Sequence, residues 1–209
     1  MEVVNLNQIG VSFKGSGSYV PKQILTNQKI SEKVDTSDEW IKSRTGISQR
    51  RISGLSENVS EMGYKAALAA IDMAKWDIDT IDLIILATST PDDLFGSAPN
   101  IQAKLEASNA VAFDLTAACS GFLFASITAT QFLKAGSYKR AVVIGSDQLS
   151  SYVNWNDRRS CILFGDGAGA IAIEVTNELD NLIGFSMRTD GQRGSFLNCL
   201  LYTSPSPRD

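Results

Sequence analysis

The sequence predicts an α/β protein in which a mostly parallel sheet is covered by helices. Two observations support this fold class: apolar runs of strand length alternate with helical patterns, and some of these runs are apolar on both faces. The clearest run is IDLIILATS over residues 81–89, which is typical of a strand buried on both sides. Repetition of strand, helix and strand indicates βαβ units, which place parallel strands in one sheet.

The expected elements follow in order from residue 58. NVSEMGYKAALAAIDMAKW predicts an amphipathic helix over 58–76, where Asn58 and Glu61 have the spacing of an N-cap residue and its N3 partner. FLFASITATQFL, residues 122–133, is apolar on nearly all faces, which fits a helix buried all round in a complete protein. In the present chain we expect part of this apolar surface to be uncovered. Helices are also expected over 98–107 and 120–136, and strands over 81–89, 110–115, 140–147 and 181–190, with further strands around a glycine-rich bend over 161–176.

Composition excludes several classes of protein. Hydrophobic residues make up 44% of the 209 residues and charged residues 20%, which is ordinary for a globular protein. The net charge of −4 is spread along the chain, so we expect no nucleic-acid partner, and no apolar run is long enough to cross a membrane. The N-terminus lacks the pattern of a secretory signal. Three cysteines without paired spacing predict neither disulfides nor a metal site, and favour a cytoplasmic location.

The last eleven residues, CLLYTSPSPRD, lack the helix and strand patterns of the rest of the chain. They show no periodicity, and Pro205 and Pro207 suit neither a strand nor a helix. One back-translation of this stretch matches a transposon-end sequencing adaptor, which makes residues 199–209 a non-native tail. The alternative is a natural disordered tail. On the adaptor interpretation Cys199 has no biological role.

The stretch AFDLTAACSGFLFA places Cys119 between an expected strand and an expected helix. Backbone N–H groups and the helix dipole at such a position favour thiolate over thiol, and the small neighbours permit a sharp turn. This setting shares with the nucleophile elbow a nucleophile on a sharp strand-to-helix turn, although the residues of the GxSxG motif are absent. The alternative is a buried structural cysteine, a common fate of that residue. Cys161 lies in an apolar strand pattern and is expected to pack in the core.

Two other motifs have both a binding and a structural interpretation. GDGAGA over 165–170 lacks the helix that a dinucleotide fingerprint requires, so close backbone packing at a turn is the better account. DTSDEWIKSRTGI over 35–47 places Trp40 and Arg44 at i, i+4, where an aromatic ring and a guanidinium could hold a nucleotide-like group. The alternative is a capped surface helix with Trp40 in the core. Arg158 belongs to a polar cluster that could be a solvated loop.

Taken together, these segments resemble the β-ketoacyl-acyl-carrier-protein synthase III family of the thiolase superfamily. GSGSYVP, DTSDEWIKSRTGI, AFDLTAACSGF, VVIGSDQLS and FGDGAGA occur in the family's order and spacing, between about Ile9 and about Asn198. The resemblance implies a thiolase-like αβαβα layered fold built from two similar halves. Residues 1–176 would then be the first half, nearly complete, and residues 177–198 the start of a second half that is mostly missing.

The resemblance also implies roles for individual residues. Cys119 would take an acyl group, expected to be acetyl, from acyl-CoA as a thioester. Trp40 and Arg158 would sandwich the adenine of coenzyme A, and Thr36 and Arg44 would bind its adenine and phosphate portion.

Phe95 would reach across a homodimer to line the partner's acyl pocket. Condensation would follow with malonyl-acyl-carrier protein, and coenzyme A would enter as a thioester substrate, with no separate cofactor.

The family assists condensation with a histidine and an asparagine from its second half, and this sequence contains no histidine. We therefore expect an enzyme of fatty acid synthesis whose present chain does not condense. Two alternatives stay open. One is a short, non-catalytic relative that binds acyl-CoA, and the other is a specialised starter enzyme of secondary metabolism.

Overall fold

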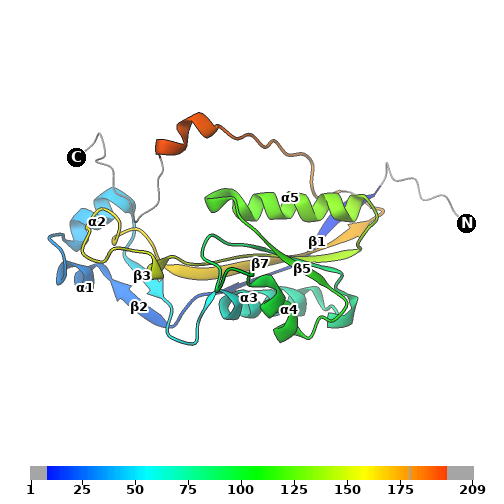
Figure 1. The fold of residues 1–209 in the computed structure, drawn as a ribbon, viewed down its shortest axis with the longest axis horizontal. Coiled ribbons are helices and arrows are strands. Elements are labelled where there is room, and N and C mark those ends of the chain that lie inside the picture. Colours follow the sequence, from blue (N-terminus) through cyan, green and yellow to red (C-terminus); the bar gives the residue numbers. More distant parts are fainter. Residues whose placement is uncertain (1–8, 179, 197–209) are drawn as a thin grey trace, which may run out of the picture.

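The computed structural model of the chain describes residues 9–178 and 180–196. Its centre is a five-stranded sheet in the order β1-β7-β6-β4-β5 (Figure 1). The strands are β1 Gly10–Tyr19, β4 Leu83–Ala87, β5 Val111–Leu115, β6 Arg140–Gln148 and β7 Asp166–Thr176. The expected non-native tail, residues 199–209, lies outside the described residues.

The sheet is mixed, which corrects the expectation of a mostly parallel one. β4 pairs in parallel with both β5 and β6, as the βαβ pattern predicts. β7 runs antiparallel to β6 and to β1. A parallel connection between β6 and β7 would need a crossover, usually a helix. Residues 149–165 contain only turns and a short 3-10 helix, so the chain re-enters the sheet at the end where β6 stops and β7 runs antiparallel to it.

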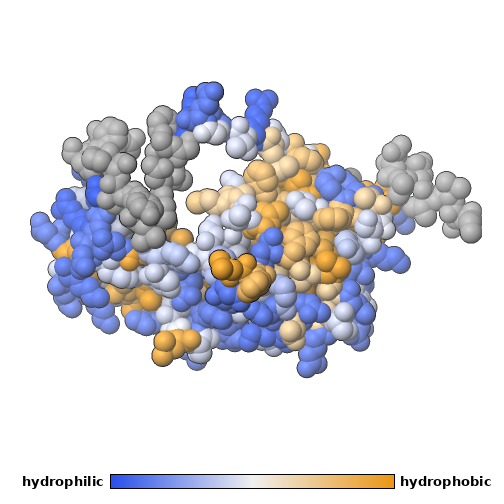
Figure 2. Space-filling view, viewed as in Figure 1, coloured by the Kyte–Doolittle hydropathy of each residue, from blue (hydrophilic) through white to orange (hydrophobic). Residues whose placement is uncertain are grey.

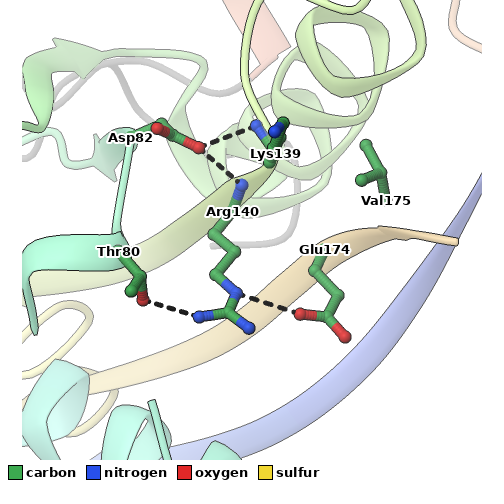
Figure 3. A pocket seen from close by; sticks show the side chains of 6 residues that line it. All are labelled: Thr80, Asp82, Lys139, Arg140, Glu174 and Val175. Atoms are coloured by element: carbon green, nitrogen blue, oxygen red, sulfur yellow. Dashed lines mark hydrogen bonds and ion pairs between the residues drawn. The ribbon is translucent and has the colours of Figure 1, made fainter. Parts of the chain in front are cut away.

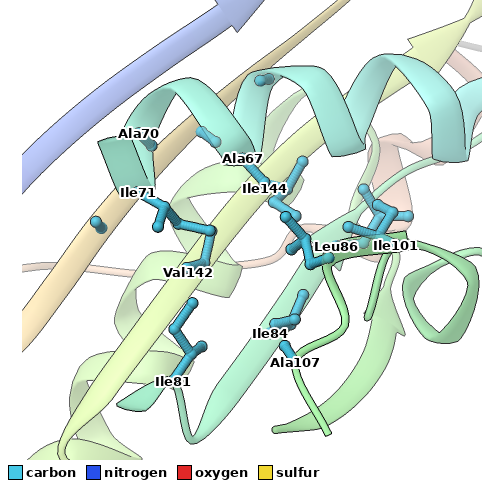
Figure 4. Close-up of a cluster of buried hydrophobic side chains, with 14 of the residues drawn as sticks. Ala67, Ala70, Ile71, Ile81, Ile84, Leu86, Ile101, Ala107, Val142 and Ile144 are labelled. Carbon is cyan, nitrogen blue, oxygen red and sulfur yellow. The ribbon is translucent and has the colours of Figure 1, made fainter. Parts of the chain in front are cut away.

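Helices cover both faces of the sheet. α3 Val59–Ala74 and α4 Ala98–Leu105 lie on one face, and α5 Gly121–Lys134 lies on the other (Figure 1). The side chain of Asn58 accepts a hydrogen bond from the N–H of Glu61, which confirms the expected N-cap of α3. Ile71, Leu86, Ile101 and Ile144 are among the buried side chains that fill the α3 side (Figure 4). The described residues thus form three of the five layers that the resemblance implies.

β1 approaches α3 unusually closely. A Cβ atom added to Gly15 or to Gly17 would lie only 2.2 Å from a backbone carbonyl oxygen of α3, that of Ala70 or Ala66 respectively. Only glycine allows this approach. The GSGSYVP motif therefore has a packing role in this fold.

Helix α5 is buried on its sheet side and leaves apolar side chains exposed on its outer side, as expected for the present chain. Ala125, Ala129 and Leu133 pack on the sheet. Leu123 is 65% exposed and Phe132 37% exposed on the outer side. Figure 2 shows apolar residues gathered over this helix.

Two expected strands are absent from the described structure. Around Cys161 the chain forms turns, because the carbonyl of Asp157 accepts hydrogen bonds from the N–H groups of both Ser160 and Cys161. Only the later part of 161–176 is a strand, β7, so the glycine-rich stretch is not a bend between two strands. No strand forms over 181–190, where Asn181 binds the backbone of the edge strand β1 through both its N–H and its side-chain oxygen.

A second, smaller unit lies at one end of the sheet. β2 Gln23–Thr26 and β3 Gln49–Ile52 form an antiparallel pair, accompanied by α1 Asn27–Ser31 and α2 Asp38–Thr45. Its own core contains Ile30, Ile41 and Cys161. Gly165 permits a close approach here, because an added Cβ would lie 2.9 Å from atoms of Arg50 and Arg51. This supports the packing interpretation of the GDGAGA motif.

Candidate active site

Cys119 lies in the sharp connection between β5 and α5. The chain leaves β5, forms a 3-10 turn over Ala118–Ser120 and enters α5 at Gly121. Ala118 has a φ of 47°, a left-handed conformation that non-glycine residues rarely adopt and that is often found at functional sites. The side chain of Cys119 is exposed. The expected strand–turn–helix setting is confirmed, and the alternative of a buried structural cysteine is wrong.

The surroundings of Cys119 suit chemistry at a carbonyl group. The first N–H groups of a helix have no partner within it, and they stabilise negative charge that develops nearby. Figure 1 shows the N-terminal end of α5 directed toward the end of the molecule where α1 and α2 lie. An acyl group attacked by the thiol would develop that charge on its oxygen.

Cys161 is the opposite kind of cysteine. It is fully buried in the core of the smaller unit, and burial raises the pKa of its thiol. The expectation that it is a packing residue is confirmed, although it lies in a turn rather than in a strand.

The structure brings Trp40 and Arg158 together from distant parts of the sequence. Ser37 caps α2 by accepting a hydrogen bond from the N–H of Trp40. The guanidinium carbon of Arg158 lies 4.9 Å from the centroid of the Trp40 ring, and its Nη1 donates to the carbonyl oxygen of Asp35 at 3.0 Å. This is a cation–π pair.

Thr36 and Arg44 lie close to Trp40 in the chain. The hydroxyl oxygen of Thr36 is buried without a hydrogen-bond partner, one residue after Asp35. Arg44 is exposed in the last turn of α2, on the same helix as Trp40. A hydroxyl without a partner and two exposed guanidinium groups suit a ligand that carries phosphates.

Phe95 stands apart from these residues. It is 93% exposed and lines a surface groove of about 570 Å³ together with residues of β5 such as Leu115. β5 is an edge strand of the sheet. Its neighbour Leu94 is 99% exposed, and adjacent exposed apolar side chains beside an edge strand are typical of a surface that meets another chain.

Two aspartates that the sequence analysis missed hold the loop that carries Phe95. Asp147 Oδ1 accepts hydrogen bonds from Thr88, Ser89 and Thr90, just after β4. The two carboxylate oxygens of Asp114 accept from the N–H groups of residues 97 and 98, at the start of α4. A signal was present, since both acids stand in otherwise apolar strand patterns.

The comparisons with known proteins agree with these motifs. A family model described as 3-oxoacyl-[acyl-carrier-protein (ACP)] synthase III matches residues 113–191. A curated β-ketoacyl-[acyl-carrier-protein] synthase III from Prochlorococcus marinus subsp. pastoris is 90% identical over 198 residues, which are 95% of this chain and 59% of the relative. The chain belongs to the β-ketoacyl-acyl-carrier-protein synthase III family. It spans about three fifths of the length of the curated synthase III relatives that it matches.

Solved synthase III structures share this fold. The 3-oxoacyl-(acyl carrier protein) synthase III of Pseudomonas aeruginosa matches with a TM-score of 0.84 and 33% identity, over 96% of this chain and 62% of that one. The synthase III of Aquifex aeolicus matches with a TM-score of 0.79 and 46% identity, over 81% of this chain and 55% of that one. The expected thiolase-like fold class is therefore confirmed.

Another cavity of this synthase III chain has a structural explanation. It measures about 340 Å³ and lies at the amino ends of β4 and β6 (Figure 3). Asp82 accepts from the N–H groups of Lys139 and Arg140, and the Arg140 guanidinium binds Thr80 and Glu174. These groups bind one another, and sites in parallel sheets lie at the carboxyl ends of the strands, where Cys119 is found.

Two further findings concern ions and membranes. Over 9–178 and 180–196, no three acidic, cysteine or histidine side chains gather so as to hold a metal ion. Within the same ranges, every helix is too short or too polar to span a bilayer.

Proposed function

We propose that the protein is a condensing enzyme that begins type II fatty acid synthesis, with Cys119 as its acyl acceptor. The observation that carries this proposal is the exposed Cys119 beside the left-handed Ala118, at the amino end of α5. Its thiolate attacks the carbonyl carbon of an acyl-CoA, expected to be acetyl-CoA. The tetrahedral intermediate then expels the coenzyme A thiolate, which takes up a proton, and the acyl group stays on Cys119 as a thioester.

Condensation with malonyl-acyl-carrier protein completes the proposed reaction. Malonyl-acyl-carrier protein loses carbon dioxide, the resulting carbanion attacks the thioester carbonyl, and the thiolate of Cys119 is released with formation of a β-ketoacyl product. The family assists this step with a histidine, and the sequence contains none. We propose that this chain by itself accepts the acyl group and does not condense it.

Trp40, Arg158, Thr36 and Arg44 are proposed to bind the nucleotide end of acyl-CoA. The guanidinium carbon of Arg158 lies 4.9 Å from the centroid of the Trp40 ring, which leaves no room for another ring between them. Adenine placed between the two groups would separate them by about 7 Å, twice the ordinary contact distance. Adenine therefore enters only when the exposed Arg158 side chain moves off the ring and takes the far side of the sandwich.

The groove beside β5 is proposed as the site of a homodimer. Leu94 and Phe95 are 99% and 93% exposed there, next to an edge strand. Pairing of two such edges would cover both side chains and place Phe95 against the partner's acyl pocket. We further propose a cytoplasmic location and no cofactor other than the coenzyme A thioester itself.

Trp40→Ala tests the nucleotide site. We expect the acyl-CoA concentration that gives half-maximal acylation to rise about tenfold, because stacking contributes about 1–2 kcal/mol to binding. The rate at saturation stays the same, since Trp40 binds the remote end of the substrate. Release of coenzyme A thiol over a range of acetyl-CoA concentrations measures both quantities.

Arg158→Ala and Arg159→Ala form the matched pair for this experiment. The first is expected to behave like Trp40→Ala. The second changes the next residue, whose guanidinium pairs with Asp157, and should leave the half-maximal concentration close to wild type. Equal half-maximal concentrations for wild type, Trp40→Ala and Arg158→Ala would remove both residues from the site.

A further inference from the structure

Arg50 of β3 is a buried guanidinium with unusual partners. Its side chain is 5% exposed, and its hydrogen bonds go to neutral oxygens: those of Leu25, Asn27 and Ile162. Its Nε is buried without a partner. Burial lowers the pKa of this group. Burying a cation among neutral acceptors lowers the stability of a fold. The contribution of Arg50 is therefore expected to come from the segments that its hydrogen bonds connect.

One branch of these hydrogen bonds leads to α2. Arg50 Nη1 donates to Asn27 Oδ1 at 2.8 Å, and Asn27 is fully buried. The amide nitrogen of Asn27 donates to Asp38 Oδ1 at 2.9 Å and to the carbonyl oxygen of Ile47 at 2.7 Å. Asp38 is the first residue of α2, and Ile47 follows its last residue by two positions. Asn27 therefore fixes both ends of the helix that carries Trp40.

The other branch leads to the loop of Arg158. Arg50 Nη2 donates to the carbonyl oxygen of Ile162 at 2.7 Å. Ile162 directly follows the turn in which the carbonyl oxygen of Asp157 accepts from the N–H groups of Ser160 and Cys161. Arg158 is the second residue of this turn. One planar group thus holds the segment of Trp40 with one nitrogen and the segment of Arg158 with the other.

We infer that Arg50 is a positioning residue that sets the spacing between Trp40 and Arg158, and thereby the fit of the nucleotide end of acyl-CoA. The inference rests on the proposed function for its ligand, but not for the coupling within the protein. The guanidinium has fixed geometry, so the segment that carries Trp40 and the segment that carries Arg158 cannot shift independently. Lysine keeps the charge but has its three donors on one nitrogen at the end of a flexible stem, so it does not hold the two acceptors at the separation that the guanidinium sets.

The test compares Arg50→Lys with Arg51→Lys in the full chain. Arg51 is the next residue of β3 and donates to the carbonyl oxygen of Pro21, away from the site. Acrylamide quenching of Trp40 fluorescence, with Trp76 and Trp155 changed to phenylalanine, reports whether the Arg158 guanidinium covers the ring. We expect Arg50→Lys to change quenching in the same direction as Arg158→Ala. The double variant Arg50→Lys/Arg158→Ala should be quenched to the same extent as Arg158→Ala alone. Arg51→Lys should match wild type.

A second readout brings in the ligand. Adenosine 3′,5′-bisphosphate is the probe for the nucleotide end, and we expect its dissociation constant to rise about tenfold in Arg50→Lys and to stay unchanged in Arg51→Lys. If Arg50→Lys does not fold, Asp38→Ala cuts the α2 branch at a half-exposed residue and should change both readouts in the same direction.

The outcomes separate the two proposals. A lower thermal midpoint for Arg50→Lys, with unchanged quenching and affinity, gives Arg50 a structural role only and overturns the inference. A wild-type chain that does not bind the probe overturns the proposed function, and the quenching data then decide the role of Arg50 alone.

Discussion

Cys119→Ser is expected to reduce acyl transfer from acetyl-CoA by about a thousandfold or more. A serine hydroxyl is a far weaker nucleophile than a thiolate unless a base removes its proton. The usual base is histidine, and the sequence contains none. Affinity for coenzyme A should stay within about twofold of wild type, because the change lies away from the nucleotide end. Release of coenzyme A thiol in single-turnover experiments gives the rate.

Cys161→Ala is the matched control for that variant. It removes the other described thiol, which is fully buried. We expect a modest loss of stability, because a buried sulfur leaves a small cavity, and an acylation rate close to wild type. If Cys119→Ser is acylated as fast as wild type while Cys161→Ala is not, the roles assigned to the two cysteines are reversed.

Gly17→Ala is expected to destabilise the fold by about 2–3 kcal/mol. The new Cβ would lie 2.2 Å from the carbonyl oxygen of Ala66 and 2.6 Å from the backbone nitrogen of Ala70. These are backbone atoms of α3, so β1 and the helix must move apart and lose packing along their contact. Urea denaturation followed by circular dichroism gives the change in the free energy of unfolding.

Gly169→Ala provides a control on the neighbouring strand β7. There the nearest atom to an added Cβ is the carbonyl oxygen of Gly17 at 3.9 Å, an ordinary contact. We expect its free energy of unfolding to lie within about 0.5 kcal/mol of wild type. Equal denaturation midpoints for the two variants would show that the close approach of β1 to α3 does not limit stability.

The parts of the fold predictable from the sequence are those that local pattern determines. The alternation of apolar runs and helical periods located α3, β4, α4, β5, α5 and β6. The cap at Asn58 and the turn at Cys119 depend on a few neighbouring residues, so the sequence displays them directly. The resemblance added Trp40 and Arg158 as partners, which no local pattern connects.

The errors share a physical cause, which is the dependence of strand formation on distant partners. The apolar stretch around Cys161 has the composition of a strand but lies in the core of the smaller unit. There the carbonyl oxygen of Asp157 accepts hydrogen bonds from the N–H groups of Ser160 and Cys161, and the chain forms turns. β1 was missed because its glycines and serines reflect contact with α3 rather than a strand pattern. The hydrogen bond from Arg50 to Ile162 spans 112 residues of sequence, beyond the reach of any motif.

The most direct test of the central claim is the location of the acyl group after the chain meets acetyl-CoA. The folded wild-type chain is incubated with acetyl-CoA, its intact mass is measured, and it is digested at acidic pH, where a thioester survives, for peptide mapping. Our account predicts one acetyl group per chain, carried by the peptide that contains Cys119 and removed by hydroxylamine. A folded chain that binds coenzyme A yet carries no acetyl group on Cys119, or as much on Cys161, would contradict it.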